Sequence, residues 1–270
     1  MSETLQVLIL GVIQGIAEWL PVSSEGVLTL VQLHVFHRSF EASLGTALWL
    51  HLGTVLAAIV YFRSEVAHIV GKLPMWAMRH RDLPDDDRRL MDFLALATVA
   101  TGVVGLPLLA LSFQADPLMR AATALIGALL ILTGVLQRVA RQFGTRSSSD
   151  VGRADALLTG LMQGLAVLPG VSRSGFTVAA LLFRRFEETE ALRLSFLMSI
   201  PVIAGAQVLV ELGGFVEMDW PTALVGTAAS ALVGWATIAG LIRVARTLPF
   251  WAFAVGLGAL SLLAALVMPQ

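Results

Sequence analysis

The sequence predicts an all-α polytopic membrane protein, an inverted-topology repeat of six spanning helices and two re-entrant helix hairpins. Three observations support this fold class. The chain of 270 residues is 57% hydrophobic and only 14% charged, whereas a soluble domain has about 25% charged residues. A polar motif inside an apolar segment occurs twice. The Lys and Arg residues gather in loops that an inverted repeat would place on one side of a membrane.

The duplicated motif lies at residues 11–26 and 160–175. The first copy reads GVIQGIAEWLPVSSEG and the second reads GLMQGLAVLPGVSRSG. Most of their shared residues keep one offset of 149 positions, as in Gln163 against Gln14, and the Leu-Pro pair is shifted by one residue. Proline, glycine and hydroxyl residues interrupt the helix in each copy. Backbone groups freed in this way survive in a membrane only inside protein or beside water, so the two breaks predict a site at the bilayer midplane.

The first half, residues 1–145, is expected to contain a re-entrant hairpin at about residues 5–35 and three helices of spanning length, about 20 residues. These spans are expected at 44–62, 93–113 and 121–139. Residues 63–92 carry both basic and acidic side chains and are expected to form a loop. We also expect Pro107 to kink the second span, and a turn around Asp116 and Pro117 to follow it.

The second half, residues 146–270, is expected to repeat this plan after a polar linker at residues 138–153. It begins with a re-entrant hairpin at about residues 154–183. Its spans are expected at about 191–212, 222–242 and 249–268. Because three spans are an odd number of crossings, the second half is predicted to be upside down relative to the first.

The basic residues test this topology, because cytoplasmic loops carry an excess of Lys and Arg. If residues 63–92 are cytoplasmic, the linker and the turn with Arg243 and Arg246 are cytoplasmic too. The turn at 213–220, which has Glu217 and Asp219 but no basic residue, then lies outside, as do both termini. The first hairpin would enter from outside and the second from the cytoplasm, so that their tips meet.

Charge and composition exclude several function classes. A net charge of −1 argues against a nucleic-acid partner, which would require a basic surface. The absence of cysteine excludes a disulfide framework and a thiolate metal site. The sequence contains no Walker loop, Rossmann fingerprint or HExxH zinc motif.

The tip of the second hairpin, residues 169–177, has the components of a phosphate-binding site. Gly170 and Gly175 let the backbone approach an anion, and a helix starting just after Gly175 would direct N–H groups and its positive end toward it. Arg173 has a planar guanidinium suited to bidentate contact with phosphate. Pairing with a buried acid for structural reasons is the alternative role of Arg173. Three hydroxyl side chains supply further donors: Ser172, Ser174 and Thr177.

The tip of the first hairpin contains the carboxylate of Glu18 and the hydroxyls of Ser23 and Ser24. A carboxylate in an apolar hairpin requires a cation, so Glu18 either pairs with Arg173 or helps to hold a divalent metal on a phosphate. Gln14 lies four residues earlier on the same helical face and can hydrogen-bond to Glu18 or to a ligand. Ser23 and Ser24 are either helix caps or catalytic groups.

Two further residues near the first motif are ionisable. Glu25 follows Ser24 and is expected to be a carboxylate of the first helical turn without a role in the site. His51 is the only one of the five histidines inside a predicted span. It is either a core histidine with its hydrogen bonds satisfied or a proton donor.

The two motifs resemble those of the undecaprenyl-diphosphatase family, the bacitracin-resistance type of membrane lipid phosphatase. The family's first motif, EGxTEFLPVSSxGH, stands here as QGIAEWLPVSSEGV at residues 14–27, and its second motif, PGxSRSGxT, is complete at residues 169–177. Length, duplication and span order match over the whole chain. The resemblance implies a plasma-membrane hydrolase with a site open to the outer face. It would remove the terminal phosphate of undecaprenyl diphosphate and give the monophosphate carrier for cell-envelope glycan assembly.

The resemblance also implies roles for single residues. Glu18 would be a catalytic carboxylate and metal ligand, with Mg or Ca as the cofactor. Arg173 would bind phosphate, and Ser24 or Thr177 would be the nucleophile. Substrate contacts would come from the remaining motif residues, Gln14, Ser23, Gly170, Ser172, Ser174 and Gly175. The expected partners are a polyprenyl diphosphate lipid and the bilayer, and a homodimer is compatible with the sequence.

Two positions depart from the family's first motif. Gln14 replaces its first glutamate, which removes a negative charge from a metal site, and Val27 replaces its histidine. A general acid or base contributes about 10²–10⁴-fold in rate. The loss therefore favours the alternative of a polyprenyl-phosphate flippase or transporter that uses the same site in alternating access. If the protein does hydrolyse its ligand, Glu18 is the nearest motif residue able to transfer a proton, and His51 is the reserve candidate.

Overall fold

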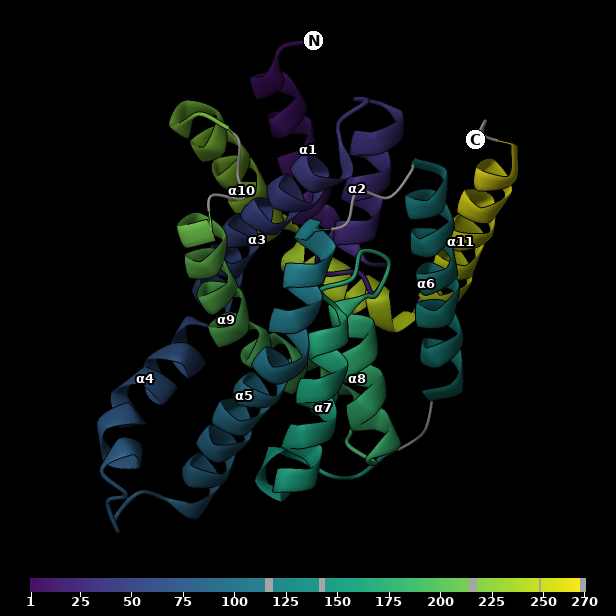
Figure 1. The fold of residues 1–270 in the computed structure, drawn as a ribbon. Coiled ribbons are helices and arrows are strands. Elements are labelled where there is room, and N and C mark those ends of the chain that lie inside the picture. The colour runs from purple at the N-terminus through teal and green to yellow at the C-terminus, as the bar shows by residue number, and fades with distance from the viewer. Residues whose placement is uncertain (115–118, 141–143, 214–217, 248, 268–270) are drawn as a thin grey trace.

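A computed structural model describes residues 1–114, 119–140, 144–213, 218–247 and 249–267 (Figure 1). Within these residues the secondary structure is helical, with eleven α-helices and one short 3-10 helix at Ser148–Asp150. Six of the helices are long and apolar enough to cross a membrane. They are α3 (Phe40–Tyr61), α5 (Asp85–Gln114), α6 (Met119–Ala140), α9 (Glu188–Gly213), α10 (Trp220–Thr247) and α11 (Phe250–Val267). The all-α polytopic fold class and the six expected spans are confirmed.

Four of the other five helices form two pairs, each around a break in the chain. The first pair is α1 (Glu3–Ala17) with α2 (Ser24–His34), and the second is α7 (Arg153–Leu165) with α8 (Arg173–Phe183). All four are shorter than the roughly 20 residues that span a bilayer. In Figure 1 the first pair enters from the end of the molecule where both termini lie, and the second pair enters from the opposite end.

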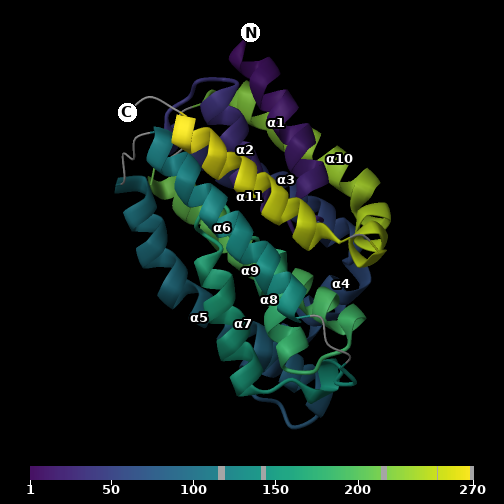
Figure 2. The same cartoon turned by 90° about the vertical axis from the view of Figure 1, so that its right-hand side faces the viewer.

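The first helix of each hairpin packs against the second span of the other half, and the third spans of the two halves pack together. Helix α1 packs along α10, whereas α7 packs along α5, and α6 packs along α11. Figure 2 shows α6 beside α11 and α1 beside α10. Glycines permit the close approach, since a Cβ at Gly11 would lie 2.7 Å from the carbonyl oxygen of Gly226. This arrangement is what an inverted repeat would produce, and the orientation of its halves in a membrane stays a prediction.

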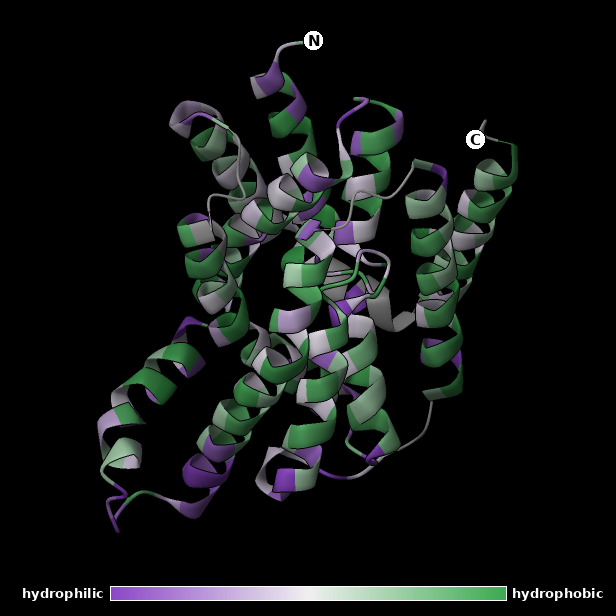
Figure 3. Cartoon of the chain, in the orientation of Figure 1, coloured by the Kyte–Doolittle hydropathy of each residue, from purple (hydrophilic) through white to green (hydrophobic). Residues whose placement is uncertain are grey.

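Residues 63–92 do not form the expected loop. Helix α4 occupies Arg63–Ala77, and α5 already begins at Asp85. The charged side chains of this stretch concealed apolar residues at helical spacing, and one of them, Ile69, packs against a buried cluster. Acidic residues open α5, where they complement the positive end of the helix. Figure 3 shows the hydrophilic ends of α4, α5 and α7 at one end of the molecule.

The turn around Asp116 and Pro117 and most of the turn at 213–220, including Glu217, lie outside the described residues. The same holds for part of the linker, residues 141–143, and for the side chain of Arg246. Pro107 lies inside α5, which continues to Gln114.

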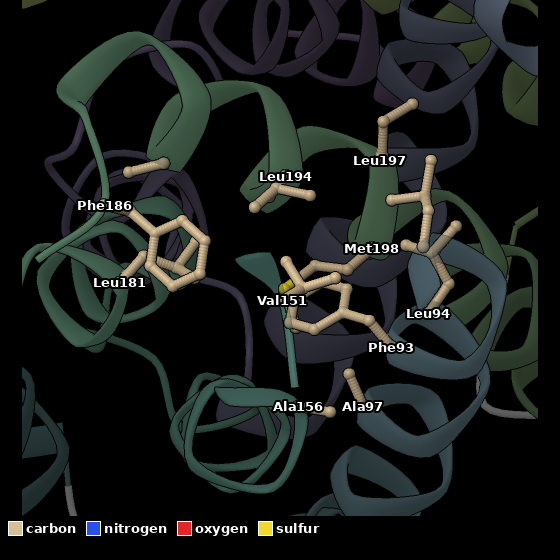
Figure 4. Close-up of a cluster of buried hydrophobic side chains, with 12 residues drawn as sticks. Phe93, Leu94, Ala97, Val151, Ala156, Leu181, Phe186, Leu194, Leu197 and Met198 are labelled. Carbon is tan, nitrogen blue, oxygen red and sulfur yellow. The ribbon is translucent and has the colours of Figure 1, made fainter. Parts of the chain in front are cut away.

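A buried apolar cluster anchors the second hairpin. It combines side chains of α5, α7, α8 and α9, among them Phe93, Ala156, Leu181 and Met198 (Figure 4). Beside it, the carboxylate of Asp155 at the start of α7 accepts hydrogen bonds from Arg146, at 2.7 Å, and from Arg184, at 2.6 Å. Burial would raise the pKa of Asp155, but the hydrogen bonds from these guanidinium groups outweigh it and lower this pKa. The base of the hairpin is thereby fixed, and α8 is directed toward the first hairpin.

Candidate functional site

The tips of the two hairpins are in direct contact. The Oγ of Ser23 accepts one hydrogen bond from the backbone N–H of Gly26, at 3.2 Å, and another from that of Gly170, at 3.1 Å. A Cβ at Gly26 would lie only 2.7 Å from the backbone nitrogen of Gly170. The two breaks, far apart in the sequence, therefore form one structural unit, as the duplicated motif predicts.

Local chain geometry explains the contact. Ser23 has a left-handed backbone with φ of 60°, and its side chain caps α2. Gly170 has φ of 104°, a conformation that favours glycine. Thr133 of α6 holds the second tip, because its hydroxyl donates to the carbonyl of Gly170 at 3.1 Å and accepts from the N–H of Ser172 at 3.2 Å. The sequence left two roles open for Ser23, helix cap or catalytic group, and the structure shows that it is a helix cap.

A small polar cavity lies between the tips. Its lining comes from both hairpins and from α3, and consists of Glu18, Leu20, Ser23, Ser24, Glu25, His51, Ala166, Val171, Ser172, Arg173 and Ser174. Most of the predicted site residues therefore gather in one place. Val27 is not part of this lining.

Arg173 and Glu18 form an ion pair across the two hairpins. The Glu18 carboxylate also accepts hydrogen bonds from Ser24 Oγ, at 2.8 Å, and from Gln14 Nε2, at 3.0 Å. Arg173 additionally lies over the ring of Phe196, 5.6 Å from its centroid. Because Glu18 is 6% exposed, this pairing is what makes a buried carboxylate tolerable. Of the two roles weighed for Glu18, the structure shows the pairing with Arg173.

His51 joins the same group from α3. Its Nε2 lies 3.3 Å from an oxygen of Glu18, and its Nδ1 lies 2.7 Å from the backbone oxygen of Ala47. Helix α3 packs against the first hairpin, which brings the reserve candidate for proton transfer to Glu18. Sequence alone could name the histidine but could not place it beside Glu18.

Glu25 lies in the site, although the sequence predicted no role for it there. It does lie in the first turn of α2, as expected. However, it is only 5% exposed, it lines the cavity, and its Oε1 has no hydrogen-bond partner. Its position after two serines is so typical of a helix start that no sequence signal distinguished it from a surface carboxylate.

The second tip differs from the prediction in two details. Helix α8 begins at Arg173 and not after Gly175, because Ser172 is the cap and its Oγ accepts from the N–H of Gly175 at 3.1 Å. Thr177 is fully buried and does not line the cavity; its hydroxyl lies 2.6 Å from Ser195 Oγ and donates to the carbonyl of Arg173 at 2.8 Å. The geometry therefore favours Ser24 over Thr177 as a nucleophile.

The donor set does not form a metal site by itself. The Glu18 carboxylate is already engaged by Arg173, Ser24 and Gln14. Among the described residues, no group of three or more His, Asp or Glu side chains is arranged to hold a metal ion. Mg²⁺ commonly binds through only one or two carboxylates together with substrate phosphates. A cation at this site would accordingly depend on a phosphorylated ligand.

A second, mostly apolar cavity adjoins the first. It shares Ser174 with the polar cavity and is otherwise lined by both tips, α6, α8, α9 and α11, with Trp19, Val178, Leu192 and Phe196 among its residues. A ligand with a charged head and an apolar chain matches this pair of cavities.

Comparisons with known proteins agree with the motifs. The family model described as bacitracin resistance protein BacA matches residues 7–263. An undecaprenyl-diphosphatase of Methanococcoides burtonii is 44% identical over 267 residues, which cover 97% of this chain and 98% of that protein. An undecaprenyl-diphosphatase of Haloarcula marismortui is 41% identical over 271 residues, which cover 99% of both chains. One of Methanothrix thermoacetophila is 37% identical over 261 residues, or 96% of both.

Proposed function

The chain belongs to the BacA family, and from this membership we propose that it is an integral membrane undecaprenyl-diphosphatase. It hydrolyses the terminal phosphate of undecaprenyl diphosphate and leaves the monophosphate, the carrier lipid for cell-envelope glycan assembly. The observation that carries this function is the buried Arg173–Glu18 pair beside Ser24 at the contact of the two hairpins. Intramembrane ionisable residues of this kind mark functional sites.

Each residue of the polar cavity has a chemical task in this reaction. Arg173 provides a planar set of donors for phosphate oxygens. The N-terminal end of α8 and the Ser174 hydroxyl favour negative charge at the same place. Glu18 accepts the hydroxyl proton of Ser24 in a hydrogen bond and so orients the Ser24 oxygen. Ser24 is therefore the nucleophile that the geometry supports, and Arg173 would turn from Glu18 toward the incoming diphosphate.

The adjoining apolar cavity supports a polyprenyl chain as the rest of the ligand. Most of its walls are aliphatic and aromatic side chains, and it meets the polar cavity at Ser174. The protein would act in the plasma membrane with its site toward the outer face, as the family resemblance implies. A homodimer and a requirement for Mg or Ca stay predictions, the cation being carried mainly by diphosphate oxygens.

Phosphate release by the purified protein tests the proposal. The protein in detergent is given undecaprenyl diphosphate with Mg²⁺, with Ca²⁺ and with a chelator. We expect release in at least one of these conditions, and loss of release in Ser24→Ala and Glu18→Gln. If no cation supports release, the hydrolase assignment is wrong, and transport of a polyprenyl phosphate in proteoliposomes becomes the assay for the flippase alternative. The relatives' names favour hydrolysis over transport.

A further inference from the structure

A second cavity with charged walls lies away from the hairpin tips, at the hydrophilic end of the molecule opposite both termini (Figures 1 and 3). It has a volume of about 480 Å³ and opens between the end of α4, helix α5 and the start of α7. Three guanidinium groups line it, those of Arg79, Arg89 and Arg153. Most of its other walls are apolar and come from Phe93, Ala95, Leu96, Val99, Val151 and Ala156.

The three arginines keep donors for a ligand. Arg89 donates one hydrogen bond to the backbone oxygen of Ser149, at 2.9 Å. In the part of the chain that the structure describes, the side chains of Arg79 and Arg153 have neither a hydrogen-bond partner nor an ion pair. The acidic residues that open α5 do not line the cavity. An anion that entered it would therefore meet unneutralised positive charge.

Arg79 occupies a backbone position that would suit glycine better. Helix α4 ends in a Schellman motif, in which the N–H of His80 donates to the carbonyl of Met75 at 2.8 Å and that of Arg79 donates to the carbonyl of Trp76 at 3.0 Å. Arg79 has the left-handed conformation of this motif, with φ of 51°, which is unfavourable for a residue with a side chain. Because these backbone bonds do not use the guanidinium, the end of α4 does not explain why an arginine stands there.

A tryptophan indicates the depth of the cavity in a membrane. Among the described residues that line the cavity, Asp92 is the one acid, and its Oδ1 accepts from Trp76 Nε1 at 2.8 Å. Tryptophan is enriched where a membrane meets water, because its ring is apolar and its N–H is polar. The bond to Asp92 therefore indicates that the cavity lies at the level of the lipid headgroups.

Exposed apolar side chains continue from the cavity toward the middle of the molecule. On α5, Val99 is 63% and Val103 is 67% exposed, one helical turn apart. On α7, Leu157 and Leu161 follow Arg153 at four-residue intervals and are 45% and 43% exposed. Helices α5 and α7 pack along each other, so two apolar rows start at the arginines and run into the membrane-spanning part of the protein.

We propose that this cavity binds an anionic phospholipid, with the headgroup phosphate between Arg79, Arg89 and Arg153 and the acyl chains along the exposed rows of α5 and α7. Guanidinium groups suit bidentate contact with phosphate. Basic pockets between spanning helices on the cytoplasmic side bind anionic headgroups, and the basic residues predict that this end is cytoplasmic. A soluble phosphate compound would use the arginines but leave the apolar rows uncovered. The cavity shares no lining residue with the polar cavity at the hairpin tips.

Thermal unfolding of the purified protein in one detergent tests the proposal, because a ligand that binds the folded state raises Tm as its concentration rises. The probes are phosphatidylglycerol, phosphatidylcholine with the same acyl chains, and glycerol phosphate. We expect phosphatidylglycerol alone to raise Tm clearly, and less so at high salt. Arg79→Gln and Arg153→Gln should each weaken its apparent affinity about fivefold. The matched control is Arg81→Gln, which removes an exposed arginine that does not line the cavity and should keep wild-type affinity.

Arg79→Gly separates the side chain from the backbone. It should raise Tm without lipid, because glycine fits the left-handed position, and should weaken the effect of phosphatidylglycerol as Arg79→Gln does.

Three outcomes would overturn the inference. One is equal affinity for phosphatidylglycerol in wild type and in the double variant Arg79→Gln/Arg153→Gln. Another is an equal rise in Tm with phosphatidylcholine or with glycerol phosphate, since the first would exclude recognition of charge and the second would make the ligand a soluble anion. The third is a loss in Arg81→Gln as large as in Arg79→Gln, which would indicate attraction by general surface charge. These measurements do not involve phosphate release, so their result is independent of the proposed hydrolase function.

Discussion

Gly26→Ala tests whether the contact between the hairpin tips creates the site. A Cβ at position 26 would lie 2.7 Å from the backbone nitrogen of Gly170 and 3.0 Å from its Cα. Both atoms belong to a backbone that cannot move freely, because Thr133 bonds Gly170 and Gly170 has φ of 104°. The added methyl must therefore push the two tips apart.

The expected loss of stability follows from two opposing terms. Overpacking costs about 1–3 kcal/mol, and replacing glycine by alanine within a helix returns about 0.5–1 kcal/mol. We expect a net loss of about 1–2 kcal/mol in the free energy of unfolding. Activity should suffer more, since displacing catalytic groups by about 1 Å can reduce the rate about 10²-fold. Ser24 and Arg173 would be displaced because they adjoin the two glycines.

Thermal unfolding in one detergent and phosphate release from undecaprenyl diphosphate measure the two effects. The matched control is Gly256→Ala in α11, where a Cβ would meet no atom within 4 Å. The control should keep wild-type activity and equal or higher stability. If Gly26→Ala matched wild type in both measurements, the reasoning that the tips touch through their backbones would be refuted.

Two further substitutions test the charged groups. Asp155→Asn replaces a buried carboxylate that accepts from Arg146 and Arg184 with a neutral amide that has one accepting oxygen, and should cost about 1.5–3 kcal/mol in unfolding experiments at neutral pH. The folded-state pKa of Asp155 is lowered, so its contribution to the free energy of unfolding is complete above the unfolded-state pKa of about 3.9. This contribution disappears as pH falls through the folded-state pKa. A stability difference between wild type and Asp155→Asn that stayed constant down to strongly acidic pH would contradict this. Arg173→Lys should weaken binding of lipid diphosphate by loss of the planar guanidinium, and Arg173→Ala should weaken it further; equal affinities in the same detergent would leave Arg173 a structural role only.

Several features could be predicted from sequence because they depend on short stretches of chain. Hydrophobic length determined the six spans, and proline, glycine and serine inside apolar runs determined the two breaks. The same stretches contain Glu18, Ser24 and Arg173. A carboxylate in an apolar segment requires a cation, so pairing with Arg173 was one of the two roles predicted for Glu18 from sequence.

Other features depended on how distant helices pack. Helix α4 was not predicted because its sequence is rich in charged residues. Its apolar side is evident only once α5 and α9 lie beside it. The placement of Thr177 away from the cavity, and of Glu25 within it, depended on the rotation of α8 and α2 about their own axes. Local sequence does not determine which side of a buried helix faces a cavity.

His51 shows most clearly which features the sequence determines and which depend on the tertiary structure. The sequence identified an intramembrane histidine and a motif that lacks one, but these are separate facts along the chain. Only the packing of α3 against the first hairpin brings His51 Nε2 to 3.3 Å from Glu18. The sequence by itself therefore determined the membrane fold and the two motifs that meet at the hairpin tips. The tertiary structure decided that the histidine of α3 stands beside Glu18, because that position depends on contacts between helices that no local pattern encodes.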